Sequence, residues 1–212
     1  MQAAGIPALA ISLVALAVSL YGIAERSSAT RRAERLRFLT LIDDLNRLLT
    51  DNPRPFDTQV EILALQAFGL QKRFTDVTSP EYRTLADALG RSGLPAEADQ
   101  LWRAAIDASE DEGPTQALFA RRGYALFLFS AGRREKGRDQ MGLALEAIGS
   151  ADDTARLHQI RTFKTWADDE RFADPTGGRA AELLKRAEQA VTLLESEHAR
   201  RRMRAFLENA DS

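Results

Sequence analysis

The feature that most constrains this chain is its start. The first 24 residues carry no charged side chain, and Ile6–Ala24 is an apolar run of 19 positions. A helix of this run is roughly 28 Å long, which is close to the thickness of the hydrocarbon core of a bilayer. Five arginines follow between Glu25 and Arg37. The pattern predicts a single-pass transmembrane anchor at residues 1–24 and a basic juxtamembrane segment at residues 25–37.

The arginines also predict an orientation, because positively charged flanks stay on the cytoplasmic side of a membrane. We therefore expect the N-terminus outside and the C-terminal domain in the cytoplasm. A secretory signal peptide is the alternative, since Gly22-Ile23-Ala24 has the small-x-small pattern of a cleavage site. The apolar run is longer than in most signal peptides, which favours an uncleaved anchor.

Composition excludes several classes of function. Basic and acidic side chains number 29 and 31, and this near balance argues against a nucleic-acid binder. The chain has no cysteine, so disulfides, thiolate catalysis and cysteine-ligated metal sites are excluded.

The rest of the sequence predicts an all-α fold. No stretch alternates apolar and polar residues as a strand does, whereas apolar residues recur three and four positions apart throughout. One such stripe consists of Phe38, Leu41, Ile42, Leu45, Leu48 and Leu49, and residues 38–78 are expected to form a helical hairpin. Breaks with proline, glycine or short polar residues separate the helices, at residues 51–55, 75–80, 93, 113–114, 132, 149–150 and 174–178.

The helices after residue 79 repeat. The key residues of the first unit, which spans residues 82–106, are Tyr82, Leu85, Ala86, Leu89, Gly93, Ala98, Trp102 and Ala105. The second unit has Tyr124, Ala125, Leu128, Gly132, Met141 and Ala144 at the equivalent places, with Gly137 where alanine is expected. In the third unit the second helix matches the pattern, with Ala180, Leu184 and Ala187. The equivalent positions Ala98, Gly137 and Ala180 are 39 and 43 residues apart.

These units resemble tetratricopeptide repeats (TPR), whose pattern is Leu-small in the first helix, glycine at the turn and Ala-x3-large-x2-Ala in the second helix. The resemblance covers residues 82 to about 194, and it places a domain of repeats at residues 79–205, before a C-terminal tail at 206–212. It implies antiparallel helical hairpins stacked as a short α-solenoid, in which Trp102 and other large residues fill the gaps between hairpins. The hairpin at residues 38–78 is then a cap or a degenerate repeat.

The resemblance also implies a concave groove lined by the first helices of the hairpins. Such grooves hold a peptide segment or a helix of a partner protein. In the first repeat the candidate groove residues are Arg83, Asp87 and Arg91. Asp99 and Arg103, on the second helix, are expected on the convex side.

No catalytic or metal-binding pattern is recognisable in the sequence. His158 and His198 lie on separate predicted helices, and the adjacent acidic pairs point to different sides of their helices. There is no phosphate-binding glycine loop, nucleophile elbow or zinc helix motif. We therefore predict no catalytic residue, cofactor or metal, and no enzyme activity.

The sequence also contains two groups of basic residues. One consists of residues 121–122 with 133–134, and the other of residues 200–204. They form a solvated face, or they contact an acidic partner or a membrane.

Three hypotheses about function follow. The first is a membrane-tethered protein interaction module, a scaffold or adaptor on the cytoplasmic face that binds a protein or peptide partner. The second keeps the repeats but places them on the other side of the membrane, as an envelope chaperone or assembly factor. The third is a structural protein that self-associates into a homo-oligomer through the anchor and the stripe at residues 38–49.

Overall fold

The computed structural model describes residues 5–51, 58–149 and 152–208, with side chains described from Ser28 onward. The described chain is helical and contains no strand, which confirms the all-α class. Its helices are α1 (Gly5–Asp51), α2 (Thr58–Gln71), α3 (Ser79–Arg91), α4 (Pro95–Glu112), α5 (Pro114–Ser130), α6 (Arg134–Ile148), α7 (Asp153–Ala173), α8 (Gly178–Thr192) and α9 (Glu197–Glu208). Residues 52–55 and Ser150, which belong to two of the predicted breaks, lie outside the described residues.

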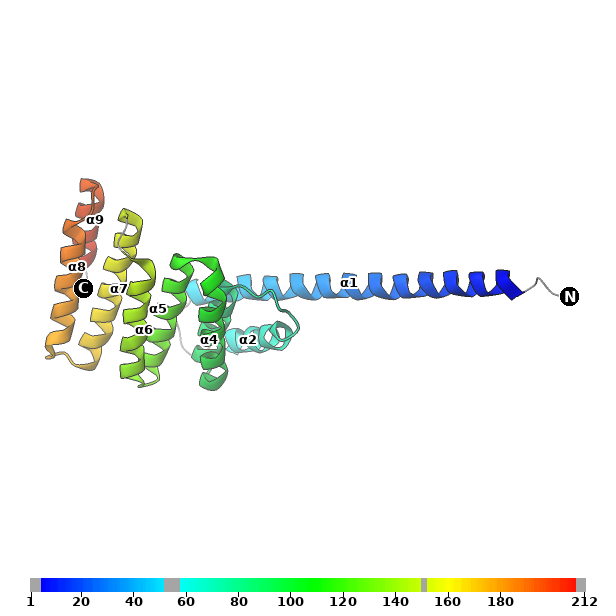
Figure 1. Ribbon diagram of the computed structural model, residues 1–212. Coiled ribbons are helices and arrows are strands. Elements are labelled where there is room, and N and C mark those ends of the chain that lie inside the picture. The colour runs from blue at the N-terminus through cyan, green and yellow to red at the C-terminus, as the bar shows by residue number, and fades with distance from the viewer. Residues whose placement is uncertain (1–4, 52–57, 150–151, 209–212) are drawn as a thin grey trace.

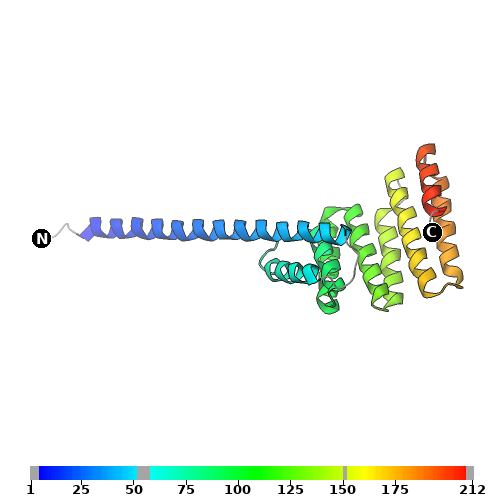
Figure 2. The ribbon, with the colours of Figure 1, turned by 180° about the vertical axis from the view of Figure 1, so that it is seen from behind.

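Helix α1 contains the predicted anchor segment but does not end with it. It is a single helix of 47 residues that projects away from the other helices before its last part packs against them (Figures 1 and 2). In the part of the chain that the structure describes, no helix is both long enough and apolar enough to cross a membrane.

This finding contradicts the anchor predicted at Ile6–Ala24 and the single-pass membrane location with its N-terminus outside. A spanning helix needs about 20 consecutive apolar residues. Beyond residue 24 the same helix continues through Arg31, Arg32 and Arg37, whose side chains are exposed.

The predicted juxtamembrane segment is also part of α1, and its Arg35 contacts protein. The Arg35 guanidinium donates hydrogen bonds to both carboxylate oxygens of Glu81 on α3, each at 3.0 Å, and to the backbone oxygen of Asp76 at 3.1 Å. It also lies over the rings of Phe38 and Phe74, at 5.3 and 5.5 Å from their centroids. Because Glu81 also accepts the Thr78 N–H at the start of α3, this ion pair docks α1 on the N-terminus of that helix.

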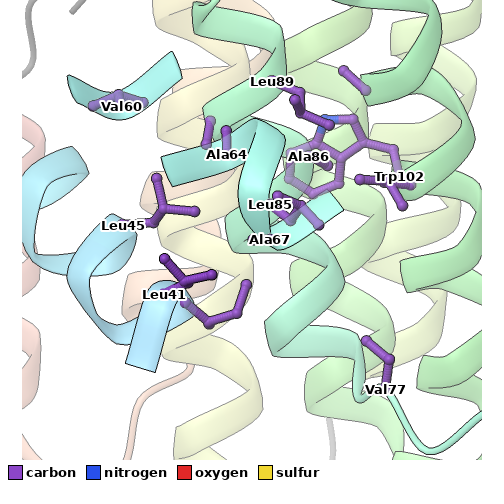
Figure 3. Packing of buried hydrophobic residues seen from close by; sticks show 14 of the residues in the cluster. Leu41, Leu45, Val60, Ala64, Ala67, Val77, Leu85, Ala86, Leu89 and Trp102 are labelled. Atoms are coloured by element: carbon purple, nitrogen blue, oxygen red, sulfur yellow. The ribbon is translucent and has the colours of Figure 1, made fainter. Parts of the chain in front are cut away.

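The stripe predicted in residues 38–49 forms the start of the hydrophobic core. Phe38, Leu41, Ile42 and Leu45 are buried, and Leu48 and Leu49 are half-buried beside them. Figure 3 shows Leu41 and Leu45 of this stripe on the side of α1 towards Ala64 and Ala67 of α2 and Leu85 of α3, which belong to the same hydrophobic cluster. Burial of these apolar side chains is what holds the last part of α1 against the body of the protein.

Successive helices pair as hairpins, and the pairs α3–α4, α5–α6 and α7–α8 make the most extensive contacts. The hairpins follow one another along the molecule (Figure 1), and the first helices also touch in order, α1 on α3, α3 on α5 and α5 on α7. The first two hairpins turn in the same way: Leu94 N–H donates to Leu89 O at 3.0 Å, and Arg133 N–H donates to Leu128 O at 2.8 Å.

Gly93 and Gly132 adopt positive φ angles of 78° and 72° in these two turns. Glycine adopts such angles without the steric cost that a Cβ atom imposes. The glycines predicted to end the first helices therefore do so through their backbone conformation.

The small and large residues of the repeat pattern occupy the positions that packing requires. Ala86, Ala98 and Ala105 are fully buried. Trp102 of α4 is buried against Gly123 of α5, where an added Cβ atom would come within 2.4 Å of Trp102 Cη2. A large side chain of one hairpin thus fills the space left by a glycine of the next.

Two carboxylates link neighbouring hairpins. Asp99 of α4 accepts hydrogen bonds from Tyr124 Oη at 3.0 Å and from Arg133 Nη2 at 2.6 Å. Glu170 of α7 accepts two hydrogen bonds from Arg138 of α6, each at 2.8 Å. Asp99, which the sequence analysis expects on the convex side, has a side chain that is only 17% exposed and bridges two hairpins.

Candidate partner-binding groove

A groove of about 1350 Å³ runs along one side of the first helices. Helices α1, α3 and α5 supply most of its lining, and Trp102 of α4 contributes to its floor. We call this space the groove. Its apolar lining includes Leu39, Ile42, Leu49, Leu126 and Phe127, and its polar lining includes Asn46, Thr50, Thr84 and Ser130. Apolar walls with scattered polar groups are typical of sites that bind a peptide or small ligand.

The three residues proposed from the sequence, Arg83, Asp87 and Arg91, all line this groove. Asp87 and Arg91 pair with each other one helical turn apart, with Nη2 and Oδ2 at 2.9 Å and Nε and Oδ1 at 3.2 Å. Their charges therefore largely cancel. Arg83 differs from both because no described carboxylate forms an ion pair with it.

Arg83 reaches from α3 towards α5. Its Nη2 donates a hydrogen bond to Gln116 Oε1 at 3.1 Å, and its buried Nε has no hydrogen-bond partner among the described residues. Burial lowers the pKa of the guanidinium, the negative charge of Glu112 raises it, and the positive charge of Arg122 lowers it. A guanidinium stays protonated in proteins even when its pKa is lowered in this way, so Arg83 contributes a positive charge to the groove wall.

Phe119 of α5 is the centre of this region of the groove. The Cζ atoms of Arg83 and Arg122 lie 5.3 and 5.2 Å from its ring centroid. The ring of His158, on α7, makes an edge contact with Phe119 at 5.1 Å between centroids and an interplanar angle of 87°. Attraction between guanidinium groups and an aromatic face holds the two arginines near each other despite their like charge.

Positive charge therefore accumulates around Phe119. Burial and the charge of Arg161 lower the pKa of Arg122. Burial, followed by the charges of Arg122 and Arg161, lowers the pKa of His158, and Asp152 opposes this shift. Among the described residues, no carboxylate forms an ion pair with Arg122 or Arg161. The His158 imidazole therefore lies in the field of two cationic side chains, Arg122 and Arg161.

Sequence analysis missed Phe119 and the role of Arg122. One signal could have found Arg122: it lies 39 residues after Arg83, the same spacing that relates Gly137 to Ala98. The sequence analysis grouped the adjacent Arg121 with it, as part of a solvated face or of a contact with an acidic partner or membrane. The structure separates the two, since Arg122 lines the groove while Arg121 donates a hydrogen bond to Gln140 of α6 at 3.4 Å.

The described residues contain no group of three or more His, Asp or Glu side chains that could hold a metal ion. In comparisons with known proteins, the chain matches no family model, no curated protein and no solved structure. The function must therefore be argued from the groove.

Proposed function

We propose that this chain is a protein interaction module, similar to tetratricopeptide repeat proteins, that binds a segment of a partner protein in the groove and catalyses no reaction. In this proposal the hairpins from α3 onward are the repeats of a short α-solenoid. Helices α1 and α2 act as the cap at its N-terminal end.

The observation that carries the proposal is the origin of the groove lining. Three helices from three successive helix pairs contribute to one continuous space of about 1350 Å³. A stacked array exposes its first helices along one face, and a groove lined by them fits an extended or helical peptide. The mixed lining supports the same occupant, because Ile42 and Leu126 can contact apolar side chains while Asn46 and Thr84 can bond to polar groups.

Site-specific photo-crosslinking tests this proposal. A photo-reactive amino acid is introduced into the full chain at Asn46 or Ser130, which are exposed and line the groove. Gln100 of α4, which is exposed and does not line the groove, is the matched control. We expect Asn46 and Ser130 to crosslink to the same segment of one partner, identified by mass spectrometry, and Gln100 not to. Crosslinking to that segment from Gln100 alone would contradict the groove assignment, and turnover of a substrate would contradict the absence of catalysis.

Self-association is a second candidate function, favoured by exposed apolar side chains on α1 and α2. Leu36, Ile62 and Leu65 are 65%, 51% and 47% exposed. The stripe at residues 38–49 does not serve this purpose, because its central residues are buried within the chain. Sedimentation velocity of the full chain and of a Leu36→Glu, Ile62→Glu variant distinguishes the two candidates. A concentration-dependent oligomer that the variant loses favours self-association.

A further inference from the structure

The arginines around Phe119 suggest what kind of partner the groove accepts. Arg83 of α3 and Arg122 of α5 both lie over the Phe119 ring, and the positive charge of Arg161 of α7 also acts on Arg122. Like charges brought together in a partly buried region cost free energy unless an anion compensates them. Ion pairs supply such compensation elsewhere in the described chain, as for Arg138 with Glu170 and Arg35 with Glu81.

The carboxylates nearest to this cluster are already in use. Glu112 accepts the Ser79 N–H at 2.8 Å, and Asp152 accepts the Ala155 N–H at 2.7 Å at the start of α7. They act on Arg83 and His158 only through longer-range attraction. Arg83 and Arg122 are therefore left without a direct anionic partner among the described residues.

We propose that Arg83 and Arg122 form a subsite for an acidic side chain of the partner segment, a glutamate or aspartate, and that Phe119 holds the two guanidinium groups in place. The proposal rests on the proposed function and specifies its partner class. Charge complementarity is the argument: guanidinium groups donate paired hydrogen bonds to a carboxylate, and a partly buried setting strengthens them. The apolar lining around Leu126 and Phe127 adds apolar neighbours for that acidic residue.

A bound carboxylate would also act on His158. The charged groups that act on this imidazole are Arg122 from α5, Arg161 from α7 itself and Asp152 at the N-cap of α7. An anion beside Arg122 screens its positive charge, so the pKa of His158, whose ring contacts Phe119, rises towards its ordinary value in the complex. Binding is then coupled to the uptake of a proton by His158. The affinity for the partner segment therefore increases as the pH falls from the pKa of His158 in the complex to its lower pKa in the free protein. A rise of about one pKa unit corresponds to up to about tenfold in affinity.

The first test uses labelled 12-residue peptides titrated into the full chain. One peptide alternates leucine and glutamate, a second has glutamine in place of glutamate, and a third has phosphoserine in place of one glutamate. We expect the glutamate peptide to bind about tenfold more tightly than the glutamine peptide, since a hydrogen bond to a charged group contributes that much. The Arg122→Gln variant should lose this preference, and Arg121→Gln, its neighbour on the other side of α5, should keep it.

Three outcomes would overturn the subsite. The first is equal binding of the glutamate and glutamine peptides, including no binding of either, and the second is an equal effect of the two arginine substitutions. The third is tenfold tighter binding of the phosphoserine peptide, which would assign a phosphorylated partner instead. Crosslinking from Asn46 and Ser130 tests independently whether the partner binds in the groove. A result against the acidic subsite can therefore be distinguished from a result against the groove.

The second test uses the wild-type chain and does not depend on a variant that folds. The chain has two histidines, so NMR of the imidazole Cε1–H groups gives one signal from the proposed subsite and one from His198 on α9. We expect the glutamate peptide to shift the His158 signal and raise the pKa of His158, without shifting the His198 signal. A His158 titration curve unchanged at saturating peptide would overturn the proposal.

Discussion

Gly137 of α6 lies against the ring of Phe129 of α5: a Cβ atom added at Gly137 would come within 2.5 Å of Phe129 Cε1. At the equivalent positions of the preceding hairpin, 39 residues earlier, the smaller residue lies on the first helix and the larger one on the second. Gly90 of α3 faces Ala98 of α4, and a Cβ atom added at Gly90 would lie 3.8 Å from the Ala98 Cβ atom. Each hairpin thus places one small residue opposite a larger one, and this exchange explains glycine at position 137 where the repeat pattern expects alanine.

The two glycines should respond differently to alanine. Gly137→Ala should lower the free energy of unfolding by about 1–3 kcal/mol, because the new methyl group overpacks against the Phe129 ring and outweighs the better helix propensity of alanine. Gly90→Ala should leave stability unchanged or raise it by up to about 1 kcal/mol, since its nearest neighbour, Phe127 Cδ2, lies at an ordinary 3.4 Å. Urea unfolding followed by circular dichroism measures both. Equal effects would contradict the inverted packing.

Ala98 provides a second test of the hairpin core. It is fully buried, whereas Ala96, two residues earlier on α4, is exposed. Ala98→Arg should lower the free energy of unfolding by about 3 kcal/mol or more, because a long charged side chain cannot fit at a helix crossing. Ala96→Arg should change it by less than about 0.5 kcal/mol. The melting temperatures of the two variants, compared with that of the wild type, decide the matter, and similar values would show that the crossing is misplaced.

Asp99 and Arg103 form an ion pair on α4 but should not be equally sensitive to charge reversal. Burial alone would raise the pKa of Asp99, but hydrogen bonds from Arg133 and Tyr124 outweigh it and leave this pKa below its usual range. Asp99→Lys should therefore lower the free energy of unfolding by about 2 kcal/mol or more, since it opposes Arg133 and leaves Tyr124 without its acceptor. Arg103→Glu should cost less than about 1 kcal/mol, because the Arg103 side chain is 63% exposed. Chemical denaturation of both variants at pH 7 provides the comparison.

Much of the fold could be predicted because the governing interactions are local in sequence. The helical spacing of Phe38, Leu41 and Leu45 predicts the buried stripe of α1, and Gly93 and Gly132 mark turns that only a residue tolerant of positive φ adopts easily. The predicted membrane anchor is wrong: among the described residues no helix is long and apolar enough to cross a membrane, and the helix that contains the apolar run continues to Asp51.

The candidate site could be predicted only in part. Arg83, which lines the groove, was predicted there because the resemblance to a repeat suggests which side of its helix faces the groove. Arg121 and Arg122 are adjacent, and which of them faces the groove depends on how α5 is rotated against α3 and α6, which is set by packing far along the chain. The same holds for Asp99 with Arg133 and for Glu170 with Arg138, whose partners lie 34 and 32 residues apart.

Glu170 should make the stability of the hairpin array depend on acid. Its side chain is 4% exposed, and hydrogen bonds from Arg138, opposed by burial and assisted by Trp166, lower its pKa from 4.5 to about 2. A lowered pKa stabilises the folded protein above the unfolded-state value, and this contribution is lost as the pH falls from about 4.5 through about 2. Glu170→Gln should therefore lower the free energy of unfolding by about 2–3 kcal/mol at pH 7 and by almost nothing at pH 2.

Glu135, which also pairs with Arg138 but is 83% exposed, is the control: Glu135→Gln should lower the free energy of unfolding by less than about 0.5 kcal/mol at either pH. Urea unfolding of the three proteins at pH 7, 4.5, 3 and 2 measures these differences, and parallel pH profiles for wild type and Glu170→Gln would show that Glu170 does not carry the acid dependence.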